Sequence, residues 1–319
     1  MVTAIKEYRC KRCGAPLKIT PETIVAICGY CGYPNWISHV EEQILIIPSL
    51  SRDEVKFSFK KRISEDFDLR KIKDKIKIVT VDGAYIPFYF YTVRAEAYYE
   101  GWRVETVAVK RGKRTILETR RKMVRDRICS TLKISILARR GAEDFSIKEL
   151  TDYYRYANPE TVDIMQIDWS KVKLPILKTE IPVDEADILA RDKAMNIMRE
   201  KAKSKVSELT KFICRAKILE RSPLTLLPYW YVIYSYRGAQ YRAAYAGWDR
   251  HLLTAQEPIM PYHRILYFIG SVAGCLISSL GMVFSHHIST LLLSLIIGGG
   301  ISFYFGDRLV SDVRIERGV

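Results

Sequence analysis

Residues 86–102 read IPFYFYTVRAEAYYEGW, and a longer version of this stretch, LPYWYVIYSYRGAQYRAAYAGW, returns at residues 227–248. In the first copy Val93, Ala95 and Ala97 alternate with polar residues. Successive strand side chains point to opposite faces of a sheet, so this alternation predicts a strand with one buried face. The aromatic run after each proline is predicted to pack in the same β-core. The alternative is a platform on which nucleic-acid bases stack.

Each copy follows an Ile-Pro pair and a helical stretch. Pro48 precedes a helix that begins at Ser51, where Glu54 completes a capping box, and Pro182 precedes a helix that begins at Asp184. A hairpin turn is expected at Arg237-Gly238-Ala239-Gln240 in the second copy. We therefore predict an α+β fold with two duplicated units built on antiparallel sheets, residues 39–178 and 179–262.

The helix that begins at Asp184 has a pattern of its own. Acidic residues stand at its start and lysines at its end, which complements the helix dipole. Spacing along the helix predicts the composition of its buried face. That face is expected to carry Ile188, Met195, Met198, Ala202 and Leu209.

Before the first unit stand two cysteine pairs, CKRCG at 10–14 and CGYCG at 28–32. Short β-prone runs, Leu17–Thr20 and Thr23–Ile27, are predicted to form a hairpin that links them. Paired cysteines at this spacing are typical of a closed tetrahedral zinc site, which has a structural rather than a catalytic role because no coordination position is open. Residues 1–38 are thus predicted to be a zinc ribbon with the ligands Cys10, Cys13, Cys28 and Cys31.

The remaining cysteines, Cys129, Cys214 and Cys275, are scattered. We interpret them as buried small hydrophobic residues. Few Asn and Gln together with many Lys, Glu, Ile and Tyr indicate a thermophile, and intracellular proteins of such organisms can carry disulfides. A bridge between Cys129 and Cys214 therefore stays an alternative.

The C-terminal part carries two uncharged stretches, residues 265–284 and 290–306, each long enough for a membrane-spanning helix. They predict a transmembrane helical hairpin at 263–306 and a tail at 307–319. Lys and Arg precede the first stretch and follow the second, which predicts the cytoplasmic membrane with both termini in the cytoplasm. Gly270, Gly274 and Ser278 would let the helices pack on each other or on a second copy in a homo-oligomer.

The formal net charge is +15, and much of the excess lies in residues 110–140. KRGKR at 110–114 is predicted to be a turn, and the alternation of Leu132, Ile134, Ile136 and Ala138 predicts a strand. The charges either form a solvated face or bind an anionic partner, namely lipid headgroups, nucleic acid or an acidic protein. The candidate residues are Lys110, Arg111, Lys113, Arg114, Arg120, Arg121, Lys122, Arg125 and Arg127.

Motifs of common enzyme classes are absent from the sequence, which contains no HExxH, GxSxG or GxxxxGK[ST]. We expect no enzymatic activity.

The ribbon, IIPSLSRDEVKFSFKKRI, GAYIPFYFY, LLPYWYVIYSYRGAQYRAAYAGW and the terminal apolar hairpin together resemble a family of prokaryotic membrane-anchored zinc-ribbon proteins. These proteins are often labelled TFIIB-type zinc-ribbon or primosomal-protein-N-prime-like. The resemblance implies structural zinc and a role beside phage-shock or SPFH-type scaffold proteins. The expected function is therefore a non-enzymatic membrane adaptor, and the alternative is a membrane-tethered nucleic-acid-binding protein.

Overall fold

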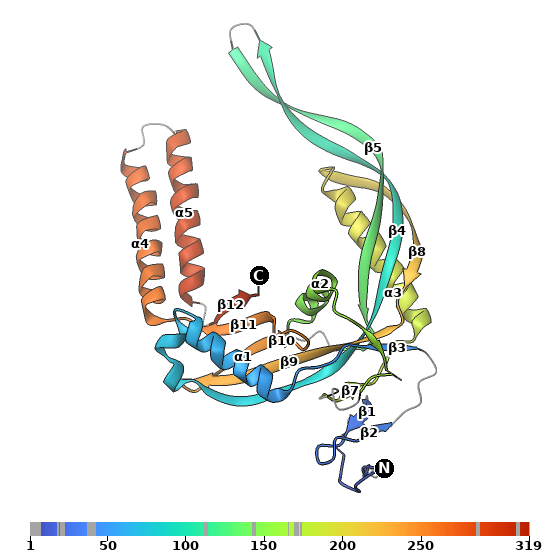
Figure 1. Cartoon of the computed structure of the whole chain (residues 1–319). Coiled ribbons are helices and arrows are strands. Elements are labelled where there is room, and N and C mark those ends of the chain that lie inside the picture. The colour runs from blue at the N-terminus through green and yellow to red at the C-terminus, as the bar shows by residue number, and fades with distance from the viewer. Residues whose placement is uncertain are drawn as a thin grey trace, which may run out of the picture. The chain divides into compact units, whose positions relative to one another are not determined.

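In a computed structural model the chain divides into two compact units that interleave along the sequence (Figure 1). Unit 1 comprises Met1–Ser49, Gly83–Ile147 and Tyr154–Tyr229, and unit 2 comprises Leu50–Asp82, Lys148–Tyr153 and Trp230–Val319. The structure describes residues 8–17, 19, 23–36, 43–111, 114–141, 145–164, 166–168, 172, 174–284, 288–310 and 313–318.

The main sheet of unit 1 is built on a long antiparallel pair, β4 (Lys77–Arg111) and β5 (Arg114–Leu137), which are in register from Phe88↔Leu137 to Arg111↔Arg114. On its other edge β4 pairs with β8 (Glu208–Arg221), as far as Trp102↔Glu208. The predicted alternation is confirmed, because Val93, Ala95, Ala97 and Tyr99 are buried while Arg94 and Glu96 are exposed. The predicted strand 132–138 is confirmed as part of β5.

One helix of unit 1, α3 (Val183–Lys203), packs against β5 and β8. Its acidic first turn and basic last turn are confirmed. The predicted buried face is wrong in part, since Ile188 is 56% exposed and Leu209 lies in β8. Small side chains let the helix backbone approach the sheet closely, so alanines replace the expected large residues. The buried positions are Ala186, Ala190, Ala194, Met198 and Ala202.

Short strands join the cysteine-rich segment to the main sheet of unit 1. The predicted strand at 23–27 is confirmed as β1 (Thr23–Ile27), but it pairs with β2 (Pro34–Trp36) and β7 (Ile176–Leu177). Leu17–Thr20, the predicted partner, includes Lys18 and Thr20, which lie outside the described residues. Since β7 also pairs with β4 at Tyr85, the cysteine-rich segment is hydrogen-bonded to the main sheet of its unit.

The remaining pairings of unit 1 bring distant parts of the sequence together. β3 (Ile44–Ile46) is parallel to the start of β9 (Leu224–Tyr236) and antiparallel to β6 (Val162–Asp163). The aromatic runs after both prolines are core residues, as predicted: Phe88, Tyr89, Tyr91, Tyr229 and Trp230 are buried. The duplication of the two α+β units stays a prediction.

Unit 2 contains α1 (Arg52–Glu65), whose predicted capping box between Ser51 and Glu54 is confirmed. Phe59 on α1 packs 5.0 Å from the ring of Tyr234 on β9. The predicted turn between β9 and β10 (Ala239–Ala246) is confirmed, with φ of 52° at Arg237 and 84° at Gly238. The unit also holds two single 3₁₀ turns, η1 (Leu69–Lys71) and η2 (Lys73–Lys75), and the edge strands β11 (Leu252–Pro258) and β12 (Val313–Arg317). The helix α2 (Ile147–Ala157) belongs partly to each unit.

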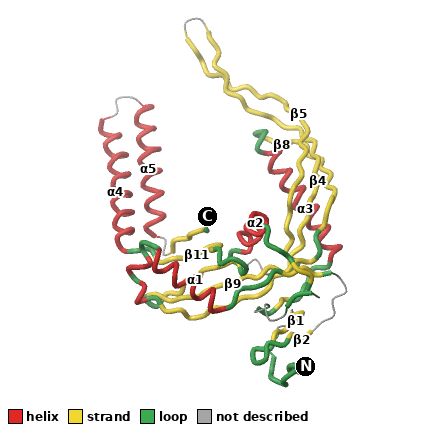
Figure 2. The backbone as a smooth tube through the Cα atoms, viewed as in Figure 1, coloured by secondary structure: helices red, strands yellow, loops and turns green. Residues whose placement is uncertain are grey.

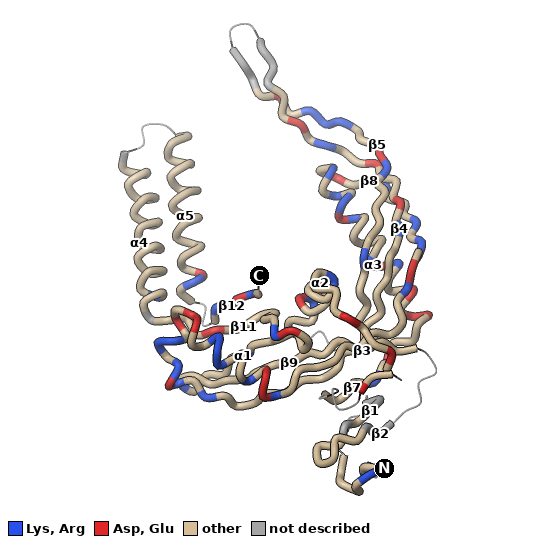
Figure 3. The backbone as a smooth tube through the Cα atoms, in the orientation of Figure 1, with Lys and Arg blue, Asp and Glu red and all other residues tan. Residues whose placement is uncertain are grey.

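Two long apolar helices of unit 2, α4 (Pro261–Phe284) and α5 (Ile288–Val310), are long and apolar enough to cross a membrane. Only 6% of each apolar span is buried, which distinguishes them from core helices. Figure 3 shows that the middle of both helices is free of charge, and their charged residues are Arg264 near the start of α4 and Asp307 and Arg308 near the end of α5. The helices pack on each other, one of the two arrangements predicted from their glycines: a Cβ on Gly274 would lie 2.6 Å from the backbone nitrogen of Ser302. The residues between them, 285–287, lie outside the described part of the chain.

Both ends of this helix pair are attached to one edge of a sheet. β11 and β12 pair from Thr254↔Arg317 to Pro258↔Val313. The end of β11 and the start of α4 are separated only by Ile259 and Met260. The segments that lead into α4 and out of α5 are therefore neighbours. The start of α4 and the end of α5 thus lie at the same end of the helix pair.

Candidate metal centre

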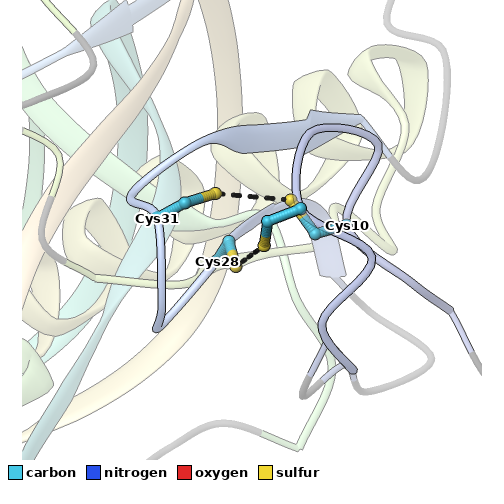
Figure 4. Close-up of side chains that lie close together, drawn as sticks. Cys10, Cys28 and Cys31 are labelled. Atoms are coloured by element: carbon cyan, nitrogen blue, oxygen red, sulfur yellow. Dashed lines mark hydrogen bonds between the residues drawn. The ribbon is translucent and has the colours of Figure 1, made fainter.

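The four predicted cysteine ligands come together at the N-terminal end of unit 1 (Figure 4). All four Sγ atoms lie within 4.8 Å of one another. The Sγ atoms of Cys10 and Cys31 are 3.6 Å apart, and those of Cys13 and Cys28 are 3.5 Å apart. A tetrahedral ion with metal–sulfur bonds of about 2.3 Å requires sulfurs about 3.8 Å apart. The cluster thus has the donor type and the spacing to hold a metal ion.

The backbone forms similar turns at the two cysteine pairs. Gly14 donates its N–H to the carbonyl oxygen of Cys10 at 2.9 Å, and Gly32 donates to Cys28 at the same distance. Both glycines have positive φ, 72° and 69°, a conformation that other residues rarely adopt. This conformation explains why each CxxC pair is followed directly by glycine.

Asn35 is a supporting residue that sequence reasoning did not single out. Its side chain is buried and donates to the Sγ of Cys10 at 3.5 Å and to the carbonyl oxygen of Tyr33 at 2.9 Å. Its Oδ1 accepts from the backbone N–H of Lys11 at 2.8 Å. The amide therefore holds the two cysteine pairs together. A polar residue among Tyr33, Pro34 and Trp36 was the available signal.

Hydrogen bonds favour the thiolate form at two of the cysteines. Burial disfavours the thiolate of Cys10, but backbone N–H groups of Cys13 and Arg12 outweigh this effect and lower its pKa to about 6. The backbone N–H groups of Cys31 and Tyr30 lower the pKa of Cys28. The same donors would stabilise metal-bound thiolates.

The pKa of Cys13 reflects the short distances between the four cysteine sulfurs. The backbone N–H of Ala15 favours its thiolate, yet the neighbouring cysteine sulfurs raise the pKa of Cys13 to about 12. Four thiolates at this spacing repel one another, and a bound divalent cation removes the repulsion.

The other three cysteines are free, and the prediction that they are buried is wrong. Cys129 and Cys275 are exposed and Cys214 is half-buried. Cys129 stands opposite Glu96 on the open face of the sheet, whereas Cys214 stands opposite Ala97 on the face that α3 covers. A disulfide between them is excluded because their side chains point away from each other.

Most of the predicted anion-binding residues lie on a two-stranded extension of β4 and β5 (Figure 2). Arg125 and Arg127 lie just before it, opposite Glu100 and Tyr98, where β8 also pairs with β4. Beyond Trp102 no described residue of β8 pairs with β4, so residues 103–111 and 114–122 pair only with each other in the described part of the chain. We call residues 103–127 the basic arm. Lys110, Arg111 and Arg114 are at its strand ends, and Lys113 lies outside the described residues.

The strand register divides the remaining basic residues between the two faces of the arm. Arg121, Arg125 and Arg127 share one face, while Arg120 and Lys122 share the other. Several are paired: Arg120 lies 3.2 Å from Glu118, and Arg125 lies 3.6 Å from Glu100. By the strand register the arm therefore has two basic faces, rather than the single patch that a count of charges implies. Acidic residues are interspersed among the basic ones along both strands (Figure 3).

A second group of potential ligands, Asp66, Glu257 and Glu316, lies in unit 2. Arg62 contacts two of these carboxylates, Glu257 at 2.6 Å and Glu316 at 3.2 Å. The guanidinium accounts for this acidic group without a metal ion.

Comparisons with known proteins return no similar protein. No family model matches the chain, and neither curated proteins nor solved structures give a match.

Proposed function

We propose that the protein is a non-enzymatic membrane adaptor, with a zinc ribbon and a basic arm on the cytoplasmic side of the membrane. The observation that carries the proposal is the exposed α4–α5 pair, whose flanking segments belong to the adjacent strands β11 and β12. An apolar pair of helices with so little buried surface is unfavourable in water and favourable in a bilayer. Arg264 before the first apolar stretch and Arg308 after the second favour cytoplasmic placement of both ends.

Zinc is the metal that we propose for the cysteine cluster. Four thiolates in tetrahedral spacing suit zinc, and no position is left open for a substrate. The ion would therefore stabilise the fold of residues 8–36 and would not take part in a reaction. This role agrees with the expectation of an adaptor.

The basic arm would present cationic side chains to an acidic partner protein or to anionic lipid. It has two accessible faces, and among its apolar residues Leu117 is 70% exposed. The resemblance noted above makes phage-shock or SPFH-type scaffold proteins the partners to test first.

The test uses the full chain in native membranes, with chemical crosslinking before solubilisation. The wild type should stay with the membrane after a carbonate wash and should co-purify with a specific set of proteins. Arg120→Gln/Arg121→Gln/Lys122→Gln should lose those proteins while remaining in the membrane. The matched control Lys201→Gln/Lys203→Gln/Lys205→Gln alters the end of α3 and the residues after it, and should retain them. Release by carbonate, or an unchanged set of proteins in the arm variant, would contradict the proposal.

A second candidate function, nucleic-acid binding, is favoured by the uncovered face of β4, β5 and β8. There Tyr98 and Trp102 lie among arginines, and the guanidinium of Arg121 is 5.7 Å from the Trp102 ring. Such a surface could stack bases and contact phosphates. Tight binding of single-stranded DNA or RNA by the purified chain, falling steeply with salt, would favour this candidate over the adaptor.

A further inference from the structure

A strongly basic segment of unit 2 lies beside the start of α4. Residues 67–77 read FDLRKIKDKIK and connect α1 to β4. We call them the collar. The collar follows the basic second half of α1 and was not among the sequence-based candidates. Its cations are Arg70, Lys71, Lys73, Lys75 and Lys77, and its acids are Asp68 and Asp74.

The collar is fixed to the first turn of α4 by Asp68. The hydroxyl of Tyr262 donates to this carboxylate, and Nε2 of His263 lies 3.3 Å from it. Arg314 of β12 lies 3.5 Å from the same carboxylate. Since Tyr262 and His263 begin the apolar helix, the collar lies at the level where that helix would leave a bilayer.

Cationic side chains of the collar lie against aromatic rings. Phe67 is 61% exposed, and Nζ of Lys71 lies 3.7 Å from the centre of its ring and 4.6 Å from that of Tyr262. The guanidinium of Arg70 lies 5.0 Å from the Phe67 ring. Aromatic rings flanked by long basic side chains suit the boundary between acyl chains and headgroups, where the ring leaves water and the cations stay at the phosphates.

An open cavity of about 490 Å³ lies between the collar and α1. Lys56 and Lys60 of α1 and Lys73 of the collar line it, together with Asp74 as its one acid. Ile63 and Ile76 also line it. A lining of apolar side chains and several cations suits an amphiphile that carries negative charge.

We propose that the collar binds anionic phospholipid headgroups at the membrane surface. This inference rests on the proposed insertion of α4 and α5, and it is independent of the partner of the basic arm. Lipid is the occupant that the observations favour, because the collar contacts an apolar helix and exposes a phenyl ring.

The experiment measures thermal unfolding of the full chain in a neutral detergent while phosphatidylglycerol or phosphatidylcholine is added. Phosphatidylglycerol should raise the Tm of the wild type, and phosphatidylcholine should have a much smaller effect. Arg70→Gln/Lys71→Gln/Lys73→Gln should need about 100-fold more phosphatidylglycerol for the same rise, since each cation near an anionic surface contributes to binding. Phe67→Ala should weaken the response to a smaller extent.

The charge-matched control is Lys211→Gln/Arg215→Gln/Lys217→Gln on the open face of β8, and it should respond as the wild type does. The inference is overturned if the collar variant keeps the full response, or if both lipids stabilise the wild type equally. A carbonate wash of native membranes tests insertion separately. Release of the wild type from the membrane would refute the proposed anchoring. Retention of the wild type, combined with a collar variant whose Tm still rises with phosphatidylglycerol as the wild type's does, would refute only the proposed lipid binding.

Discussion

At the scale of single residues, Asn35 connects the two cysteine pairs. Its amide contacts the sulfur of Cys10 and also three backbone groups, so its removal would free the turn that positions this ligand. We expect Asn35→Ala to lower zinc affinity about 10- to 100-fold, as the loss of a hydrogen-bond partner of a metal ligand typically does. Competition with a chromogenic chelator measures this change. Tyr30→Ala, at an 80% exposed knuckle residue, is the control and should leave affinity unchanged.

Glu257 makes unit 2 sensitive to pH. Burial raises its pKa from 4.5 to about 7, and Glu316 adds to this effect, although the ion pair with Arg62 opposes it. Between these values the folded protein keeps a proton that the unfolded chain releases, so this contribution to stability is complete below pH 4.5 and is lost as the pH rises to 7.

Glu257→Gln should therefore reduce the loss of stability between pH 5 and pH 7.5, by up to about 3 kcal/mol. Thermal unfolding of the full chain in detergent at the two pH values measures the change. Glu65→Gln alters an exposed acid of α1 and should leave the pH dependence as it is in the wild type. An unchanged dependence in Glu257→Gln would show that other groups cause it.

At the scale of elements, the close contact between α4 and α5 depends on glycines, of which Gly274 is one. A Cβ at Gly274 would lie 2.6 Å from the nitrogen of Ser302 and 2.7 Å from the carbonyl oxygen of Gly298, so the helices would have to separate. Gly274→Ala should destabilise the helix pair by about 1–3 kcal/mol, the usual cost of overpacking. A lower Tm in detergent would show this. Gly299→Ala is the matched control, because a Cβ there has no neighbour within 4 Å among the described residues.

Individual elements were predictable where local chemistry determines them. The alternation of β4, the capping box of α1, the turn at Gly238 and the cysteine turns each depend on a few neighbouring residues. The buried face of α3 was not predictable in the same way. Helical periodicity favours large apolar residues as the buried ones and does not show how closely the sheet approaches the helix backbone. The division of the basic arm into two faces likewise depends on strand register, which a count of charges ignores.

At the scale of the whole molecule, the metal centre is connected to the main sheet of unit 1 through β1 and β7. Removal of the metal with a chelator should therefore destabilise the strands next to the cysteine turns as well as the turns themselves. Hydrogen exchange should speed up in β1, β2 and β7, while β10, β11 and the apolar helices keep their protection. Cys28→Ser/Cys31→Ser should give the same pattern without chelator. Faster exchange throughout unit 2 would contradict this separation.

The cysteine-rich segment, the helices α1 and α3 and the apolar helix pair were predictable in their order along the chain, but strand β12 in the predicted tail and the interleaving of the two units were not. Unit 2 takes segments from residues 50–82, 148–153 and 230–319, and nothing local to the middle segment marks it. The collar was missed for a related reason. In sequence its cations do not stand out from the other basic residues of the chain. Only the tertiary contact between Asp68 and Tyr262 shows that they lie beside α4.

The pairing of β12 with β11 also has a consequence for biogenesis. A ribosome releases β12 only after α5, so β11 keeps an open edge throughout the insertion of both helices. The edge closes only if the second helix returns the chain to the side from which the first one left. A molecule in which α5 stays outside the bilayer, or inserts the wrong way, would carry an unpaired β11. Under the proposed anchoring, pairing of β12 with β11 would therefore require that α5 has returned the chain to the side from which α4 left.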